Sequence, residues 1–112
     1  MLVGRSSPFG GQTRTRVLLA LGLLGESHLR ELARVLETRL SGIQQAIRSL
    51  ELDGLVAGRS IGRTRVYRID PRYFAYRELM EYVLRLAAPE EKLQQRVESL
   101  RRRPRRTMKP IG

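Results

Sequence analysis

The sequence predicts a mainly α fold that carries one small antiparallel β-hairpin. Three observations support this: an apolar run over 17–24, two short amphipathic segments over 29–36 and 39–52, and a stretch at 58–66 in which turn residues stand between residues typical of strands. Only two residues separate the amphipathic segments, so the predicted helices meet at a tight turn. A length of 112 residues allows one domain rather than two.

The apolar run at 17–24 is apolar nearly all round, which is typical of a helix covered on more than one side. It is far too short to span a bilayer. Residues 1–12 are polar, rich in Gly, Pro and Ser, and without an apolar run. We therefore expect a flexible N-terminal arm rather than a signal peptide, and hence a cytoplasmic protein, with which the absence of cysteine is compatible.

The first amphipathic segment has one apolar stripe, made of Leu29, Leu32, Ala33 and Leu36. In the second, apolar residues recur at steps of three, four and three, at Leu40, Ile43, Ile47 and Leu50. Both stripes are predicted to face a core. The opposite side of the second helix then carries five polar residues and no acidic one: Arg39, Ser41, Gln44, Gln45 and Arg48.

These five side chains suit the edges of DNA bases, because Arg pairs with guanine and Gln with adenine through two hydrogen bonds each. Thr38 stands where it would cap the helix N-terminus, and free amides there would face a phosphate. The alternative is an ordinary solvated helix face. On this helix alone, the two interpretations stay open.

The stretch after the second helix predicts a hairpin with a basic tip. Gly54 can end the helix in a left-handed conformation, and Gly62 allows a turn over 60–63. Neither side of the strand over 64–69 is cleanly apolar, so its buried face is not assigned. We expect three arginines near the tip to reach the DNA backbone or a minor groove: Arg59, Arg63 and Arg65.

Residues 13–86 resemble a winged helix-turn-helix domain of the ArsR or MarR type of bacterial and archaeal transcription regulator. The resemblance is carried by LRELAR at 29–34, IQQAIRSLELDGLV at 43–56 and GRTRVYRID at 62–70. The opening FGGQTR at 9–14 is similar to a subgroup whose members stand alone or are fused to a nucleotidyltransferase. The resemblance implies a winged helix-turn-helix domain over 13–87, with additional C-terminal helices.

Carried over to this chain, the DNA-reading positions of the family are Arg39, Ser41, Gly42, Gln44, Gln45 and Arg48, and its wing is the hairpin over 58–66 with Arg59, Arg63 and Arg65. The chain departs from the family pattern at two places. Glu37 stands where the turn between the helices usually holds a glycine, and His28, beside Ser27, stands where the first helix usually has a hydroxyl cap. Gly42 costs a helix about 1 kcal/mol; it either lets the backbone approach DNA closely or is a tolerated weak point.

The charge distribution agrees with a nucleic-acid partner. The net charge is +11, and the basic residues are arginines except for Lys92 and Lys109. Residues 38–68 carry a net charge of +4 and residues 101–112 a net charge of +6. The excess charge therefore lies on the predicted reading surface and on the C-terminal tail.

Two more helices are predicted before that tail. The first, over about 72–87, has apolar and aromatic residues on more than one face, which fits core or interface packing better than a ligand pocket. The second, over 88–103, has a thin stripe of Leu93, Val97 and Leu100. The stripe could pair with a symmetry mate, dock on the first helix or stay solvated; we assign this helix to dimerisation, because so short a chain would gain from a shared core.

Residues 104–112 form a predicted disordered tail, because like charges repel and prolines interrupt the segment. Non-specific phosphate contacts are expected from Arg101, Arg102, Arg103, Arg105, Arg106 and Lys109. The tail could equally raise solubility or touch RNA.

The sequence gives little support for catalysis. One His, no Cys and scattered carboxylates provide no nucleophile with a base and no metal cluster, and Gly10-Gly11 lacks the strand and lysine of a nucleotide site. We expect no enzyme, no metal and no cofactor. Metal sensing through thiolates, frequent in ArsR-type regulators, needs the cysteines that this chain lacks.

The function expected from these observations is sequence-specific binding of double-stranded DNA by a homodimeric transcription regulator, in the first place a repressor. One alternative is an adaptor that binds a separate protein such as a nucleotidyltransferase. Another is a non-specific architectural or RNA-binding protein dominated by its arginine tail.

Overall fold

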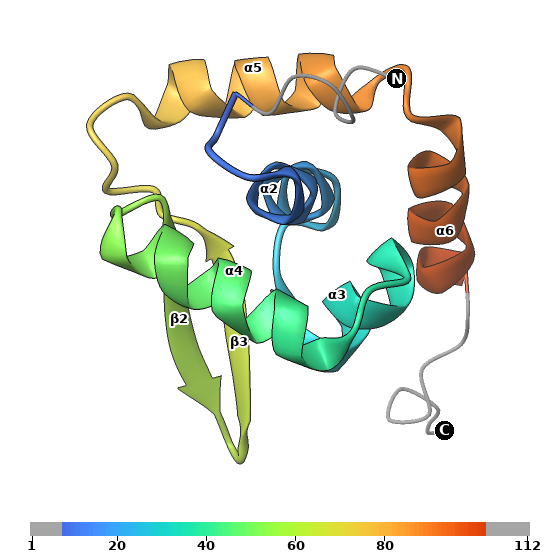
Figure 1. Cartoon of the computed structure of the whole chain (residues 1–112), viewed down its shortest axis with the longest axis horizontal. Helices are drawn as coiled ribbons and strands as arrows, with labels where there is room; N and C mark the ends of the chain where they lie inside the picture. Colours follow the sequence, from blue (N-terminus) through green and yellow to red (C-terminus); the bar gives the residue numbers. More distant parts are fainter. Residues whose placement is uncertain (1–7, 103–112) are drawn as a thin grey trace, which may run out of the picture.

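The computed structural model describes residues 8–102, and within them it has five helices and a three-stranded antiparallel sheet (Figure 1). The mainly α prediction is therefore confirmed. In chain order the elements are α2 (Gln12–Leu24), β1 (Ser27–His28), α3 (Leu29–Leu36), α4 (Leu40–Leu52), β2 (Val56–Ile61), β3 (Thr64–Ile69), α5 (Tyr76–Ala87) and α6 (Glu91–Arg102).

Helix α2 is the centre of the fold. Figure 1 shows it nearly end-on, with α5 on one side, α3 and α4 on the opposite side, and α6 beside it. Residues 17–21 are each at most 1% exposed, so no side of this stretch faces water. The predicted helix with neighbours on several sides is confirmed, and each fully buried Val or Leu contributes about 1.5–3 kcal/mol of hydrophobic free energy.

Helices α3 and α4 bury one side each. The buried residues are Leu32, Val35 and Leu36 on α3 and Ile43, Ala46, Ile47 and Leu50 on α4. The prediction that Thr38 caps α4 is wrong: its hydroxyl donates to the carbonyl of Leu36 at 3.0 Å and accepts from Arg16 at 3.3 Å. The N-cap position is Arg39, which makes no side-chain capping bond, and the helix starts at Leu40.

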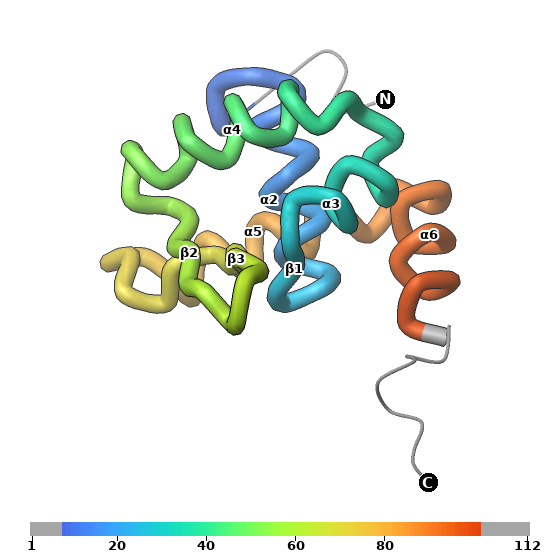
Figure 2. The backbone as a smooth tube through the Cα atoms, turned by 90° about the horizontal axis from the view of Figure 1, so that it is seen from below, coloured from blue at the N-terminus to red at the C-terminus, as the bar shows by residue number. Residues whose placement is uncertain are grey.

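The hairpin is confirmed, with one additional strand, and its buried face is now assigned. Two residues of β1 form an additional strand that the sequence pattern did not show, and the strand order is β1-β3-β2 (Figure 2). The face of β3 that carries Tyr67 and Ile69 is buried, together with Val56 opposite Ile69 on β2. Gly62 turns the hairpin with a φ of 62°, and Gly54 ends α4 with a φ of 77°.

Helix α5 starts at Tyr76, four residues later than predicted. The reason is the turn after β3, where the carboxylate of Asp70 accepts from the backbone N–H of Arg72 at 2.9 Å. The carbonyl of Asp70 accepts from the N–H of Tyr73 at 3.0 Å. These bonds hold the segment in turns rather than in a helix.

Helix α6 docks on α2 and α3 of its own chain, with Leu93 and Val97 buried and Leu100 partly buried. Of the three possibilities for its apolar stripe, docking on the first helix is the one observed. The stripe is therefore no argument for pairing of α6 with a second copy. Arg101, an exposed residue predicted to bind phosphate, donates to the carbonyl of Leu23 near the C-terminus of α2.

Two other predictions lie partly or wholly outside the described residues. Of the predicted arm, residues 8–11 are described, and Phe9 packs against Tyr82 with ring centroids 5.6 Å apart. The predicted tail, with Arg103, Arg105, Arg106 and Lys109, falls entirely outside them. Over residues 8–102, no helix has the length and apolar character needed to cross a membrane.

Candidate nucleic-acid interface

The solvent-facing side of α4 carries the polar residues that the sequence assigned to DNA reading. Arg39, Ser41, Gln44, Gln45 and Arg48 are all exposed. Within residues 8–102, none of these side chains forms a hydrogen bond or an ion pair. Since the apolar stripe of α4 anchors the opposite side, four unpaired polar side chains face the solvent from the helix, and Arg39 is exposed at its N-cap. We call these five residues the α4 polar face.

Gly42 lies half-buried within the first turn of α4. A Cβ added there would come within 3.4 Å of the Thr38 methyl group, close to an ordinary contact distance. The fold therefore makes no strong steric demand for glycine at this position. Both earlier interpretations of Gly42 remain compatible with this geometry.

A groove next to the α4 polar face was missed by sequence reasoning. It has a volume of about 500 Å³ and lies between the first turn of α2 and α4, lined by Gln12 and Thr13 on one side and Gly42 and Gln45 on the other. Arg14 holds the two helices together through an ion pair with Asp53 at 2.7 Å and a hydrogen bond to Ser49 Oγ at 2.6 Å. No local pattern links residues so far apart, so the sequence carried no signal for this groove.

The β2–β3 hairpin projects beyond the helices beside α4 (Figure 1). Arg63 lies in its exposed two-residue turn. Arg65 lies on the hairpin face that packs toward α4, with its guanidinium 5.8 Å from the Tyr67 ring centroid and 3.9 Å from a carboxylate oxygen of Glu51. Among the described residues Arg63 forms no ion pair, whereas Arg65 is within ion-pair distance of Glu51.

Arg59 differs from the other two hairpin arginines. Its guanidinium is bound by both carboxylate oxygens of Glu26 at 2.8–3.2 Å. Arg59 pairs with Val66 in the sheet and Ser60 pairs with Arg65, so Arg59 and Arg65 lie on opposite faces. The structure thus places Arg65 on the α4 side and Arg63 at the exposed turn, and leaves Arg59 compensated on the other face.

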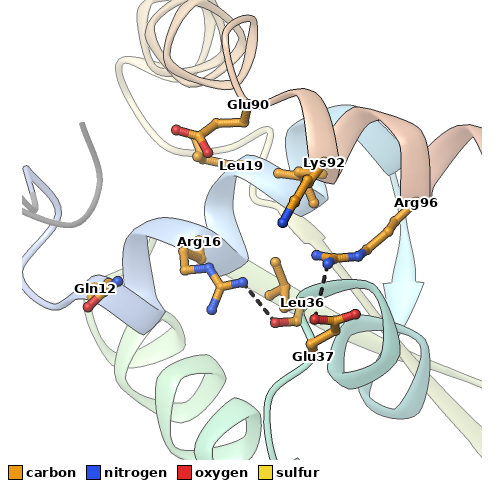
Figure 3. Close-up of a pocket in the computed structure, with 9 residues that line it drawn as sticks. Gln12, Arg16, Leu19, Leu36, Glu37, Glu90, Lys92 and Arg96 are labelled. Carbon is orange, nitrogen blue, oxygen red and sulfur yellow. Dashed lines mark hydrogen bonds and ion pairs between the residues drawn. The ribbon is translucent and has the colours of Figure 1, made fainter. Parts of the chain in front are cut away.

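The structure shows what surrounds His28 and Glu37, the two residues that depart from the winged helix-turn-helix pattern that the sequence resembles. His28 is the N-cap of α3, and its Nδ1 accepts from the N–H of Glu31 at 3.3 Å. Glu37 takes the left-handed conformation with a φ of 51°. Its carboxylate is 3.0 Å from Arg96 of α6, while Arg16 of α2 donates to the carbonyl of Leu36 at 2.8 Å (Figure 3). Side chains from two other helices therefore hold the turn between α3 and α4.

Among residues 8–102, no group of three or more His, Asp or Glu side chains is placed to hold a metal ion. The chain matches no protein-family model, no curated protein and no solved structure.

Proposed function

We propose that the protein is a winged helix-turn-helix transcription regulator that binds double-stranded DNA with α4 in the major groove. The observation that carries the proposal is the α4 polar face: five exposed side chains, free of partners among the described residues and without a carboxylate among them. Arg and Gln recognise guanine and adenine edges, and Ser can donate or accept. In this proposal α3 and α4 form the helix-turn-helix and α4 is the reading helix.

The hairpin is the proposed wing. Arg63 at its turn and Arg65 on the α4 side are placed to contact the backbone or a minor groove flanking the site. Arg59 contributes less, because Glu26 already compensates its charge. The groove between α2 and α4 gives the flanking backbone a second place to approach, since Gln12 and Thr13 line it.

We further propose that the protein acts as a homodimer, with α5 rather than α6 at the interface. Leu84 on α5 is 41% exposed and Phe74 just before α5 is 92% exposed, whereas Tyr82 lies on the other flank of the helix, where it packs against Phe9. A two-fold dimer would read two half-sites about 10 bp apart. Bound over a promoter, such a dimer would act as the expected repressor. Sedimentation of the wild-type protein and of Leu84→Glu tests the dimer, which the substitution should weaken.

The experiment for DNA reading starts with selection of bound sequences from a random duplex pool. Affinity for the selected duplex and for a scrambled one is then measured by fluorescence anisotropy. Gln44→Ala and Arg48→Ala should each reduce the difference between the two duplexes by about 1–3 kcal/mol. Matched controls are Gln95→Ala on α6 and Arg85→Ala on α5, both exposed residues on other helices, which should leave that difference unchanged.

The same titrations distinguish the other functions. Deletion of residues 103–112 should lower the salt dependence of binding and preserve the preference for the selected duplex. Equal affinity for random duplexes and structured RNA would favour an architectural or RNA-binding protein. A stoichiometric enzyme that copurifies, together with the absence of a selected sequence, would favour the adaptor.

A further inference from the structure

A cavity of about 270 Å³ lies beside the turn between α3 and α4 (Figure 3). Its walls come from α2, from α6 and from the end of α3 with the following Glu37. Three leucines give it an apolar lining: Leu19, Leu36 and Leu93. At roughly 30 Å³ per water molecule, the cavity has room for a small ligand.

Three basic side chains converge on this cavity. Figure 3 shows Arg16 from α2 and Lys92 and Arg96 from α6 with their charged ends directed into the same space. Arg16 is bound to the Leu36 carbonyl and Arg96 to Glu37. Lys92 forms no ion pair within residues 8–102. The cavity thus has one cation available and two that are already engaged with the turn.

We propose that this cavity is a binding site for a compact oxyanion with at least two negative charges, such as a phosphate ester or a di- or tricarboxylate. Such an anion would bind Lys92 and Arg96 together and would take Arg96 from Glu37. Charge-assisted hydrogen bonds from ammonium and guanidinium groups are the interactions that recognise this class of ligand.

The ligand needs more than one negative charge because the Glu37 carboxylate of the protein competes with it for Arg96. The Glu37 carboxylate is tethered 3.0 Å from Arg96, and a monovalent anion offers Arg96 no more than Glu37 does. A multivalent anion gains Lys92 as well. The second carboxylate of the cavity, Glu90, lies at the opposite end from Arg96 in Figure 3, so it limits the size of the ligand rather than occupying the cation cluster.

Occupation of the site would change the turn that precedes α4. Glu37 holds a left-handed conformation that is unfavourable for a residue with a side chain, and Arg96 is its ion-pair partner. Loss of that partner removes one of the two side-chain contacts that hold the turn, while the contact of Arg16 with the carbonyl of Leu36 stays, so we expect a partial loosening at the start of α4. The anion is therefore expected to weaken DNA binding, a consequence that rests on the proposed function.

The site itself is tested without DNA, by titrating the full chain with pyrophosphate and with citrate at constant ionic strength while backbone amide NMR shifts are followed. Acetate serves as the monovalent comparison. We expect saturable shifts at residues 37, 38, 92 and 96 with one or both multivalent anions and none with acetate. The two anions distinguish a phosphate ligand from a carboxylate ligand.

Two substitutions are expected to change the affinity in opposite directions. Lys92→Gln should weaken binding about tenfold, as expected for one charge-assisted hydrogen bond, and Glu37→Gln should strengthen it because the internal competitor is lost. Matched controls with the same charge changes on exposed positions, Arg85→Gln and Glu98→Gln, should change the affinity much less.

The proposal is overturned if neither multivalent anion produces saturable shifts at the turn, or if each control changes the affinity as much as its counterpart. Anisotropy titration of the selected duplex with and without pyrophosphate or citrate then tests the coupling. Saturable anion binding without any DNA binding would remove the proposed function and leave the site. DNA binding without anion binding would remove the proposed anion site and leave the proposed function.

Discussion

Helices α2 and α4 are both thirteen residues long, yet they have opposite roles in this fold. Residues 17–21 of α2 are buried on every side, whereas α4 buries only four residues on one side and exposes a polar surface on the other. The difference shows that apolar residues placed all round a helix produce a scaffold. Apolar residues confined to a stripe leave a surface that can bind a partner.

The largest expected effect is on stability, at the centre of α2. Leu18 is fully buried, so Leu18→Ala should lower the free energy of unfolding by about 2–5 kcal/mol, because it leaves a cavity among packed side chains. Gln44→Ala on α4 should change it by no more than about 0.5 kcal/mol. Urea denaturation followed by circular dichroism measures both. Equal losses would contradict the division between scaffold and exposed face.

Helix α2 contains Gly22 and helix α4 contains Gly42. Substitution of each by alanine should change the stability of the fold in opposite directions. A Cβ added at Gly22 would lie 2.5 Å from Val83 Cγ1 of α5, so Gly22→Ala should destabilise the fold by about 1–3 kcal/mol through overpacking. At Gly42 the nearest atom is 3.4 Å away, so Gly42→Ala should stabilise α4 by up to about 1 kcal/mol.

Thermal unfolding of the two glycine variants gives these signs. For Gly42→Ala, the affinity for the selected duplex adds a second result. Weaker DNA binding by a more stable protein would indicate that the backbone approaches DNA at Gly42. Unchanged binding would identify Gly42 as a tolerated weak point of the helix.

The smallest expected effect is on the salt dependence of DNA binding, which should differ between variants of the hairpin arginines. Arg63→Ala should reduce the slope of log K against log salt by about 1, because it removes one phosphate contact. Arg59→Ala should change the slope less, since Glu26 binds Arg59 at 2.8 Å, and Glu26→Gln should raise DNA affinity by freeing that charge. Equal effects of Arg59→Ala and Arg63→Ala would show that the hairpin does not contact DNA from the α4 side.

The sequence predicted the features that depend on local periodicity. The burial of α2, the stripe of α4 and the turn at Gly62 all follow from patterns within a few residues. The two-residue strand β1 is too short to show a pattern. The buried face of β3 could not be assigned because Arg65, Tyr67 and Ile69 share it, and Arg65 stays exposed where the hairpin leaves the core.

Contacts between distant residues account for the other differences. Arg16 engages Thr38 and the end of α3, which are far from it in sequence, and the Thr38 hydroxyl contacts Arg16 and the carbonyl of Leu36 rather than the α4 N-terminus. Arg96 of α6 forms an ion pair with Glu37, and Arg59 of β2 forms an ion pair with Glu26, which precedes β1. Arginines that looked like free positive charges in the sequence are thus partly structural, and only the fold shows which ones.

The most direct test of the central claim is an amide NMR titration of the protein with its selected duplex. We expect the largest shift changes at the α4 polar face and around Gly62 and Arg63, with small changes on α6 and on the hairpin face that carries Arg59. Changes confined to that opposite hairpin face or to the C-terminal segment, with α4 unaffected, would contradict the proposal that α4 reads DNA.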